Sequence, residues 1–313
     1  MLYLGIDIGS VSIKYALIDE NGKVKKNDYF RTQGDVVGSI KKLLKQIKKY
    51  EVAGIGTTGS ARKFVGTILE ADLVVDEITA HRTGINFLYP NVKTILEIGG
   101  QDSKLIYFSK NSINFEMNQV CAAGTGSFLD QQASRLGMNI KKFCKKGMET
   151  TEFHAIASKC TVFAETDMIH GQQSGVPINK IIRGVHRGLV NNYFSQMCKG
   201  KKLEGAFLFE GGTSQNPVLV DEFANKLIAD GLIKRKEDLI VPKKPLNLII
   251  GALGAALLCK NKAVYNKRKV PQINEFEFLE NKECHACKND CGAKISVVVI
   301  NGKKLTIGRS CQE

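Results

Sequence analysis

A pattern of three strands followed by helices occurs twice in this chain, and it restricts the folds that the chain can adopt. The predicted strands are Leu2–Ile8, Val11–Asp19 and Val24–Thr32 in the first round, and Thr94–Ile98, Ser103–Phe108 and Ile113–Met117 in the second. In each round a glycine turn with an acidic neighbour follows the first strand. The repetition indicates an internal duplication and an α/β fold with two similar lobes.

The length of 313 residues allows two lobes and an additional small unit. We expect residues 1–95 to form the first lobe and residues 96–260 the second, with the last helix, at Ile249–Cys259, returning to the first lobe. Residues 261–313 are interpreted as a linker and a cysteine-rich, metal-binding module. No apolar run approaches the ~20 residues that cross a bilayer, and the N-terminus has no signal-peptide pattern, so we expect a cytoplasmic protein without a membrane partner.

Three glycine turns are candidates for nucleotide binding: Asp7–Lys14, Glu97–Asp102 and Phe209–Ser214. Glycines allow backbone N–H groups to approach phosphate oxygens, and carboxylates can hold Mg²⁺ or orient a water. None of the turns fits the Walker or the dinucleotide-binding glycine pattern. The candidate nucleotide-binding residues are Gly9, Ser10, Ser12, Lys14, Gly99, Gly100, Gly124, Thr125, Gly126, Gly211, Gly212 and Thr213, and the candidate catalytic residues are Asp7, Gln101 and Asp102.

Cys121 precedes a run of small residues that opens into a helical pattern with Phe128 and Leu129. A cysteine near a helix N-terminus meets unpaired N–H groups and the positive end of the helix dipole, which favour a thiolate or an anionic ligand. On local grounds alone, a buried structural cysteine beside a turn explains the same pattern.

The three turns resemble the phosphate-binding and adenosine-binding motifs of the actin, sugar-kinase and heat-shock ATPase superfamily. One branch is resembled closely: the ATP-dependent activators of 2-hydroxyacyl-CoA dehydratases and benzoyl-CoA reductases, the BadF/BadG/BcrA/BcrD ATPases. The resemblance covers roughly residues 2–260, and the segments that carry it are Asp76–His81, Ile98–Lys104, Met117–Gly126 and Ser158–Glu165.

This resemblance implies an electron-transferring ATPase that uses ATP/ADP and Mg²⁺. In this family each subunit of a homodimer gives two cysteines to one [4Fe–4S] cluster, and the matching residues are Cys121 and Cys160. Ferredoxin or flavodoxin would donate the electron, and a dehydratase or reductase component would accept it. The chain departs from the family pattern at Glu97, at Glu210, and in the turn before Arg62, where one glycine is lost.

A second cysteine group lies near the end of the sequence. Cys284, Cys287 and Cys291, with the later Cys311, form the pattern of a four-thiolate site for zinc or a second iron–sulfur cluster. A hairpin around Asn301-Gly302 is predicted within this group. A tail with cysteines but no metal is the alternative. The other cysteines, Cys144, Cys198 and Cys259, are interpreted as structural.

The formal net charge of +14 is first explained by solvated lysine-rich faces, and second by an acidic protein partner such as ferredoxin. The lysines form no aromatic-interleaved stripe, so we expect no nucleic-acid partner. Three other functions remain open at this point: activation of another low-potential iron–sulfur enzyme (a double-cubane protein or a methanogen factor), a small-molecule kinase of the same fold, and a nucleotide-sensing module without catalysis.

Overall fold

The computed structural model describes residues 1–109, 112–118, 124–157, 161–262, 267–284 and 294–307. Cys121, Cys160, Cys287, Cys291 and Cys311 lie outside these described residues. The chain forms two compact units, of which unit 1 contains Met1–Leu88 and Ile249–Glu313 and unit 2 contains Tyr89–Leu248. No helix in the described ranges is long and apolar enough to cross a membrane.

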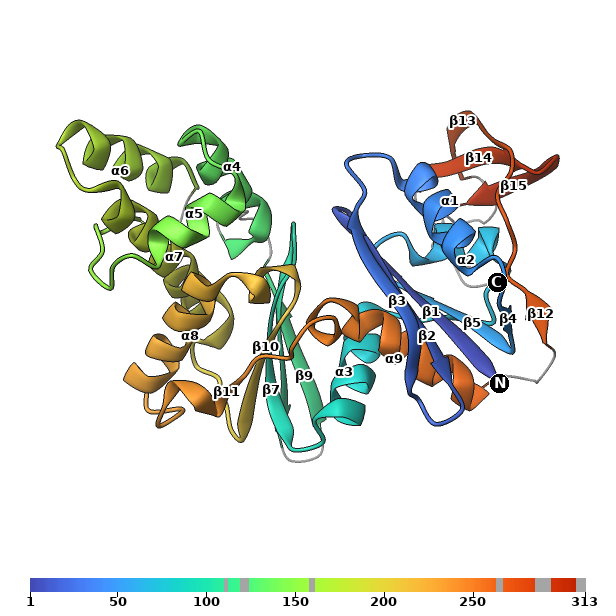
Figure 1. Ribbon diagram of the computed structural model, residues 1–313, viewed down its shortest axis with the longest axis horizontal. Helices are drawn as coiled ribbons and strands as arrows, with labels where there is room; N and C mark the ends of the chain where they lie inside the picture. Colours follow the sequence, from blue (N-terminus) through green and yellow to red (C-terminus); the bar gives the residue numbers. More distant parts are fainter. Residues whose placement is uncertain (110–111, 119–123, 158–160, 263–266, 285–293, 308–313) are drawn as a thin grey trace. The chain divides into compact units, whose positions relative to one another are not determined.

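Unit 1 is built on a five-stranded sheet with the order β3-β2-β1-β5-β6 (Figure 1). The three strands predicted in the first round are confirmed as an antiparallel meander. The strands of the sheet are β1 (Leu2–Ile8), β2 (Ser12–Asp19), β3 (Val24–Arg31), β5 (Gly54–Thr58) and β6 (Leu73–Val74). Asp35 caps helix α1 (Val36–Ile47), because its Oδ1 accepts a hydrogen bond of 2.7 Å from Gly38 N. Helix α2 (Arg62–Ile68) follows β5.

Helix α9 (Leu246–Lys262) is rich in small residues because it contacts β1, β5 and α3 (Glu77–Leu88) at backbone distance. A Cβ on Gly5 of β1 would lie 1.9 Å from the carbonyl oxygen of Ala252, and a Cβ on Gly254 would lie 1.7 Å from that of Ala80. Such approaches exclude every side chain larger than hydrogen. The glycines of α9 and of β1 are therefore packing requirements.

The C-terminal sheet packs onto unit 1. Strands β13 (Phe276–Glu283), β14 (Lys294–Ile300) and β15 (Lys303–Ile307) form an antiparallel sheet, which confirms the predicted hairpin at Asn301-Gly302. Before it, β12 (Arg268–Lys269) pairs with β4 (Glu51–Val52). Val298 and Ile300 belong to the same apolar core as Ile40 and Leu44 of α1. The described part of the tail thus shares the core of unit 1.

Unit 2 repeats the plan with a sheet of order β11-β10-β7-β8-β9. Its strands are β7 (Val92–Ile98), β8 (Ser103–Ser109), β9 (Ser112–Met117), β10 (Ala206–Glu210) and β11 (Leu239–Ile240). Strands β7, β8 and β9 are antiparallel, whereas β10 and β11 run parallel to β7 and β10 respectively. The duplication predicted from the sequence is confirmed in this arrangement.

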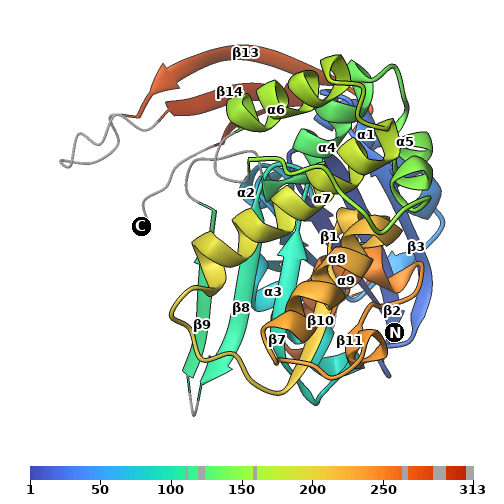
Figure 2. The ribbon, with the colours of Figure 1, turned by 90° about the vertical axis from the view of Figure 1, so that its left-hand side faces the viewer.

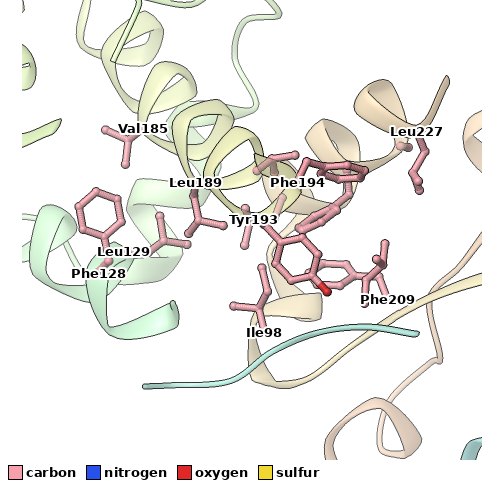
Figure 3. Packing of buried hydrophobic residues seen from close by; sticks show 14 of the residues in the cluster. Ile98, Phe128, Leu129, Val185, Leu189, Tyr193, Phe194, Phe209 and Leu227 are labelled. Carbon is pink, nitrogen blue, oxygen red and sulfur yellow. The ribbon is translucent and has the colours of Figure 1, made fainter. Parts of the chain in front are cut away.

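Helices cover one face of the unit 2 sheet, with α7 and α8 crossing it (Figure 2). The helical segments of this unit are α4 (Gly126–Arg135), α5 (Ile140–Gly147), α6 (Thr161–Gln173), α7 (Ile178–Tyr193), η2 (Phe194–Cys198), η3 (Gly212–Gln215), α8 (Pro217–Ala229) and η4 (Lys236–Asp238). Figure 3 shows Phe128 and Leu129 of α4 and Leu189 of α7 in the core above Ile98 of β7. Burial of these apolar side chains fixes the helices on the sheet.

Candidate functional site

The first glycine turn joins β1 to β2 and positions a buried carboxylate. Asp7 and Lys14 are opposite each other in the strand register, and Lys14 Nζ donates a hydrogen bond of 3.0 Å to Asp7 Oδ2. His81 of α3 lies on the other side, with Nε2 3.9 Å from the same oxygen. A Cβ on Gly251 would lie 2.7 Å from both Asp7 Oδ2 and His81 Nε2. Three elements therefore converge on Asp7, and a glycine in α9 leaves space for it.

The second glycine turn joins β7 to β8 and contains a lysine between two carboxylates. Lys104 Nζ donates to Glu97 Oε2 at 3.0 Å and to Asp102 Oδ2 at 3.1 Å. Glu97 and Lys104 are buried, and the side chain of Asp102 is partly exposed. Gly99 N donates to the carbonyl of Asp102 at 2.8 Å and closes the turn. Glu97, a departure from the family pattern, therefore makes the same lysine contact that Asp7 makes in unit 1.

The two units place a left-handed glycine beside the end of the first strand. Gly59 follows β5 with φ +95°, and its Cβ would lie 2.3 Å from the carbonyl oxygen of Ile8. Gly211 follows β10 with φ +91°, and its Cβ would lie 2.4 Å from the carbonyl oxygen of Ile98. Only glycine combines a positive φ with so close a backbone approach. Each unit thus repeats one frame: a buried carboxylate, its lysine, and this glycine.

The third glycine turn and the start of α4 meet the second turn within unit 2. Thr213 Oγ1 donates to the carbonyl of Ile98 at 2.9 Å. A Cβ on Gly126 would lie 3.0 Å from both the carbonyl oxygen of Gly99 and Cγ2 of Thr213. The backbone N–H of Gly126 donates to Gly99 O at 2.9 Å. The candidate residues of these three segments therefore form one site, while those of the first turn belong to unit 1.

Glu210 is the second departure from the family pattern, and it is buried next to this site. It pairs with Glu97 in the parallel register between β10 and β7. The sheet thus places two buried carboxylates on neighbouring strands, with Lys104 bonded to Glu97. A negative charge here disfavours a phosphate and favours a cation or a hydrogen-bond donor.

The described segments that flank Cys121 and Cys160 include two helix starts and several hydrogen bonds. Thr125 is the N-cap residue of α4, so the helix begins five residues after Cys121. Helix α6 begins at Thr161, directly after Cys160. Before Cys160, His154 N donates to Lys180 O at 2.9 Å and Ala157 N donates to Asp167 Oδ2 at 2.7 Å. Helix starts follow both cysteines, and the one after Cys121 confirms the sequence prediction.

The cysteines interpreted as structural are buried or partly buried in the structure. Burial raises the pKa of the Cys144 thiol to about 11 and the pKa of Cys198 and Cys259 to about 12. These thiols stay protonated near neutral pH and are poor metal ligands. Cys284, the described member of the tail group, is also buried. Among the described residues, no group of three or more histidine, cysteine, aspartate or glutamate side chains could hold a metal ion.

Sequence reasoning missed a polar connection between α7 and the third turn. His186 Nδ1 lies 2.8 Å from the carbonyl oxygen of Ile182, so this nitrogen carries the proton. His186 Nε2 then accepts from Asn216 Nδ2 at 2.9 Å, while Asn216 Oδ1 caps α8 by accepting from Val218 N at 3.0 Å. A lone histidine in a helical pattern carries no sequence signal for such a contact.

A duplicated sheet with glycine turns at its strand ends is the architecture of the actin, sugar-kinase and heat-shock ATPase superfamily. The model of the BadF/BadG/BcrA/BcrD ATPase family matches residues 4–259, and the chain belongs to this family. The predicted fold class and the predicted family are both confirmed.

Relatives with similar sequences or structures include activators of 2-hydroxyacyl-CoA dehydratases. The activator of lactoyl-CoA dehydratase from Anaerotignum propionicum is 34% identical over 264 residues, which cover 82% of this chain and 96% of the relative. The structure of the Acidaminococcus fermentans (R)-2-hydroxyglutaryl-CoA dehydratase component A has 31% identity and a TM-score of 0.73, covering 84% of this chain and 98% of that one. The activator of the 2-hydroxyisocaproyl-CoA dehydratase from Clostridium difficile, with bound ADPNP, has 27% identity and a TM-score of 0.73, covering 84% and 95%.

Proposed function

We propose that this protein is an ATP-hydrolysing activator that transfers low-potential electrons from a ferredoxin or flavodoxin to a partner enzyme such as a 2-hydroxyacyl-CoA dehydratase. The relatives described as dehydratase activators support the class of partner. One observation carries the proposal: Gly126 N and Ser127 N of α4 donate to Gly99 O and Gly100 O of the second glycine turn, at 2.9 and 2.8 Å. A change in a phosphate-binding turn would thereby reach the helix that follows Cys121.

The nucleotide roles follow from the charges around the turns. Asp7 and Asp102 offer the hard oxygen ligands that Mg²⁺ prefers, and Gln101 lies beside Asp102, where its amide could orient a water. Lys14 and Lys104 already contact carboxylates, so they balance the buried charge before a phosphate binds. Glu210 adds a carboxylate, and we infer that it binds a donor group of the nucleotide or a cation.

The donor chemistry of Cys121 and Cys160 fits an iron–sulfur cluster, because thiolates are the usual ligands of iron in such clusters. When bound, a [4Fe–4S] cluster stores one electron at low potential. Two thiolates per chain are half of the required set, so we infer a homodimer with the cluster on its two-fold axis. The exposure of Val162 (65%) and Phe163 (64%) at the start of α6 supports an interface at this position.

Anaerobic purification tests this proposal. We expect a brown dimer with about four iron atoms and an absorbance near 400 nm that dithionite bleaches. Cys121→Ala and Cys160→Ala should each remove the iron and preserve ATP binding, whereas the buried Cys144→Ala should retain both. A colourless, iron-free dimer after anaerobic reconstitution would refute the proposal, and ATP-dependent phosphorylation of a small molecule would favour the kinase alternative. Co-purification identifies the acceptor and separates a dehydratase from another low-potential iron–sulfur enzyme.

We further propose a zinc or iron–sulfur site for Cys284, Cys287, Cys291 and Cys311. Strand β13 ends at Glu283, opposite Lys294 of β14, and β15 ends at Ile307, opposite Ser296. The strand ends from which the cysteine-bearing segments continue in the sequence therefore lie at one end of the C-terminal sheet. Elemental analysis should find one additional metal site per chain that Cys284→Ser removes and Cys259→Ser retains. Equal metal content in both variants would contradict this assignment.

A further inference from the structure

Ser103, the first residue of β8, holds both ends of the segment that contains Cys121. Its backbone N donates to Asn118 Oδ1 at 2.7 Å, and its carbonyl oxygen accepts from Asn118 N at 3.1 Å. Its hydroxyl donates to the carbonyl of Gly124 at 2.5 Å. Asn118 and Gly124 are the last described residues on the two sides of Cys121. One side chain and its own backbone thus hold Asn118, which follows β9, and Gly124, which precedes α4.

Because these hydrogen bonds are buried, losing one of them would cost free energy and change the local structure. Ser103 is fully buried, and Thr125, next to Gly124, is fully buried too. A buried carbonyl that loses its donor keeps its desolvation penalty, so Gly124 O would have to move toward another donor or toward water. We therefore expect Gly124 to move if the Ser103 hydroxyl is removed.

Ser103 also directly follows the second glycine turn. It lies between Asp102 and Lys104, whose side chains are hydrogen-bonded to each other at 3.1 Å. A ligand that displaces Lys104 from Asp102 or Glu97 would act on residues directly bonded to Ser103. Ser103 is thus covalently bonded to the charged residues Asp102 and Lys104 and hydrogen-bonded to Asn118 and Gly124.

We propose that Ser103 is a positioning residue that sets the place of Cys121 and couples it to the nucleotide turn. The proposal deepens the function given above and rests on it for the roles of the nucleotide and of Cys121. In this proposal Ser103 contacts neither the nucleotide nor a cluster. Its action passes through Asn118 and Gly124.

Thiol labelling of the iron-free, full-length protein tests this positioning directly. We expect Ser103→Ala to increase the alkylation rate of Cys121 about tenfold, because the loop loses a buried hydrogen bond. Cys144 is an internal reference, since burial raises its pKa to about 11 and slows its reaction. Ser195→Ala is the matched control, because it removes another hydroxyl-to-carbonyl bond of unit 2, at 2.9 Å to Asn192 O, and should leave Cys121 unchanged.

A second pair of variants keeps the test valid if Ser103→Ala fails to fold. Asn118→Asp retains Oδ1 as the acceptor for Ser103 N and should label like the unmodified protein, whereas Asn118→Ala should label faster. Coupling is tested by adding Mg-ADP: we expect it to change Cys121 labelling about fivefold in the unmodified protein and much less in the Ser103→Ala protein.

The outcomes separate this inference from the proposed function. Equal Cys121 labelling, with and without Mg-ADP, in the unmodified and Ser103→Ala proteins would overturn the positioning role even if the dimer contains iron. Faster labelling and lost nucleotide response in Ser103→Ala, with no iron bound under any condition, would support the positioning role and overturn the iron–sulfur function alone.

Discussion

The buried His186 makes the stability of unit 2 depend on pH. Burial and, to a smaller extent, the charge of Arg183 on the same helix lower its pKa from the value of 6.5 for an exposed histidine to about 4, against the opposing effect of the hydrogen bond to Ile182 O. From the neighbouring elements, Asn216 of α8 donates to the ring, and Phe143 of α5 packs on it with 5.2 Å between ring centroids. A protonated ring would direct its Nε2 proton at the Asn216 amide protons, so the folded state requires the neutral ring.

The sign and size of this pH dependence follow from the difference between the pKa of His186 in the folded and in the unfolded chain. The unfolded chain binds a proton below about pH 6.5, whereas folded His186 does not until about pH 4, so this contribution is complete above pH 6.5 and is lost as the pH falls toward 4. Between about pH 7.5 and pH 5 the loss for this single group is about 2 kcal/mol.

Urea unfolding of the unmodified and His186→Gln proteins, repeated at several pH values, measures this term. The difference in free energy of unfolding between them should shrink by about 2 kcal/mol from about pH 7.5 to pH 5. Histidine NMR should show a ring that is still neutral at pH 5. A pH-independent difference, or a His186 resonance that titrates near 6.5, would refute the reasoning.

Three further predictions concern packing, charge and partner binding. Gly254→Ala should destabilise unit 1 by at least about 3 kcal/mol in thermal unfolding, because its Cβ would lie 1.7 Å from Ala80 O, whereas Gly188→Ala, with a nearest contact of 3.4 Å, should be tolerated. Lys104→Met should cost about 3 kcal/mol in urea unfolding by removing the lysine that contacts the buried Glu97 carboxylate, and adding Glu97→Gln should recover most of the loss; no recovery would contradict the pairing. The rate of electron transfer from ferredoxin should fall about tenfold between about 50 and 300 mM salt, since the chain carries a net charge of +14; a flat salt dependence would exclude electrostatic docking.

The elements that the sequence predicted are those with strong local signals. Short strand-like runs predicted β1, β2 and β3, and the Asn301-Gly302 pair predicted the hairpin of β14 and β15. Strand β13 was not predicted, because Glu277, Glu280 and Glu283 give it the composition of a solvated segment. Its stability comes from pairing with the buried strand β14, which is a tertiary effect.

The candidate site was predictable where glycines and acids recur, and the remainder depends on contacts that are distant in sequence. The parallel pairing of β7 with β10 brings Gly211 to Ile98, and no local pattern encodes that register. Ser103 is an ordinary serine at the start of a strand until Asn118 and Gly124 are placed beside it. His186 and Arg183 occupy the buried face of α7, where an amphipathic pattern predicts apolar side chains.

Unit 1 is built from two segments that are distant in the sequence, and this affects how it folds during synthesis on the ribosome. Residues 1–88 emerge first, but their partner segment begins at Ile249, roughly 160 residues later. At about 5–20 residues per second this interval lasts on the order of 10–30 s. Throughout it, Gly5 and Gly56 present bare backbone where α9 will pack, and the contiguous unit 2 is complete before α9 emerges. The early strands must therefore avoid other chains for that interval, and a nascent-chain chaperone would act on β1 and β5 before any other part of the protein.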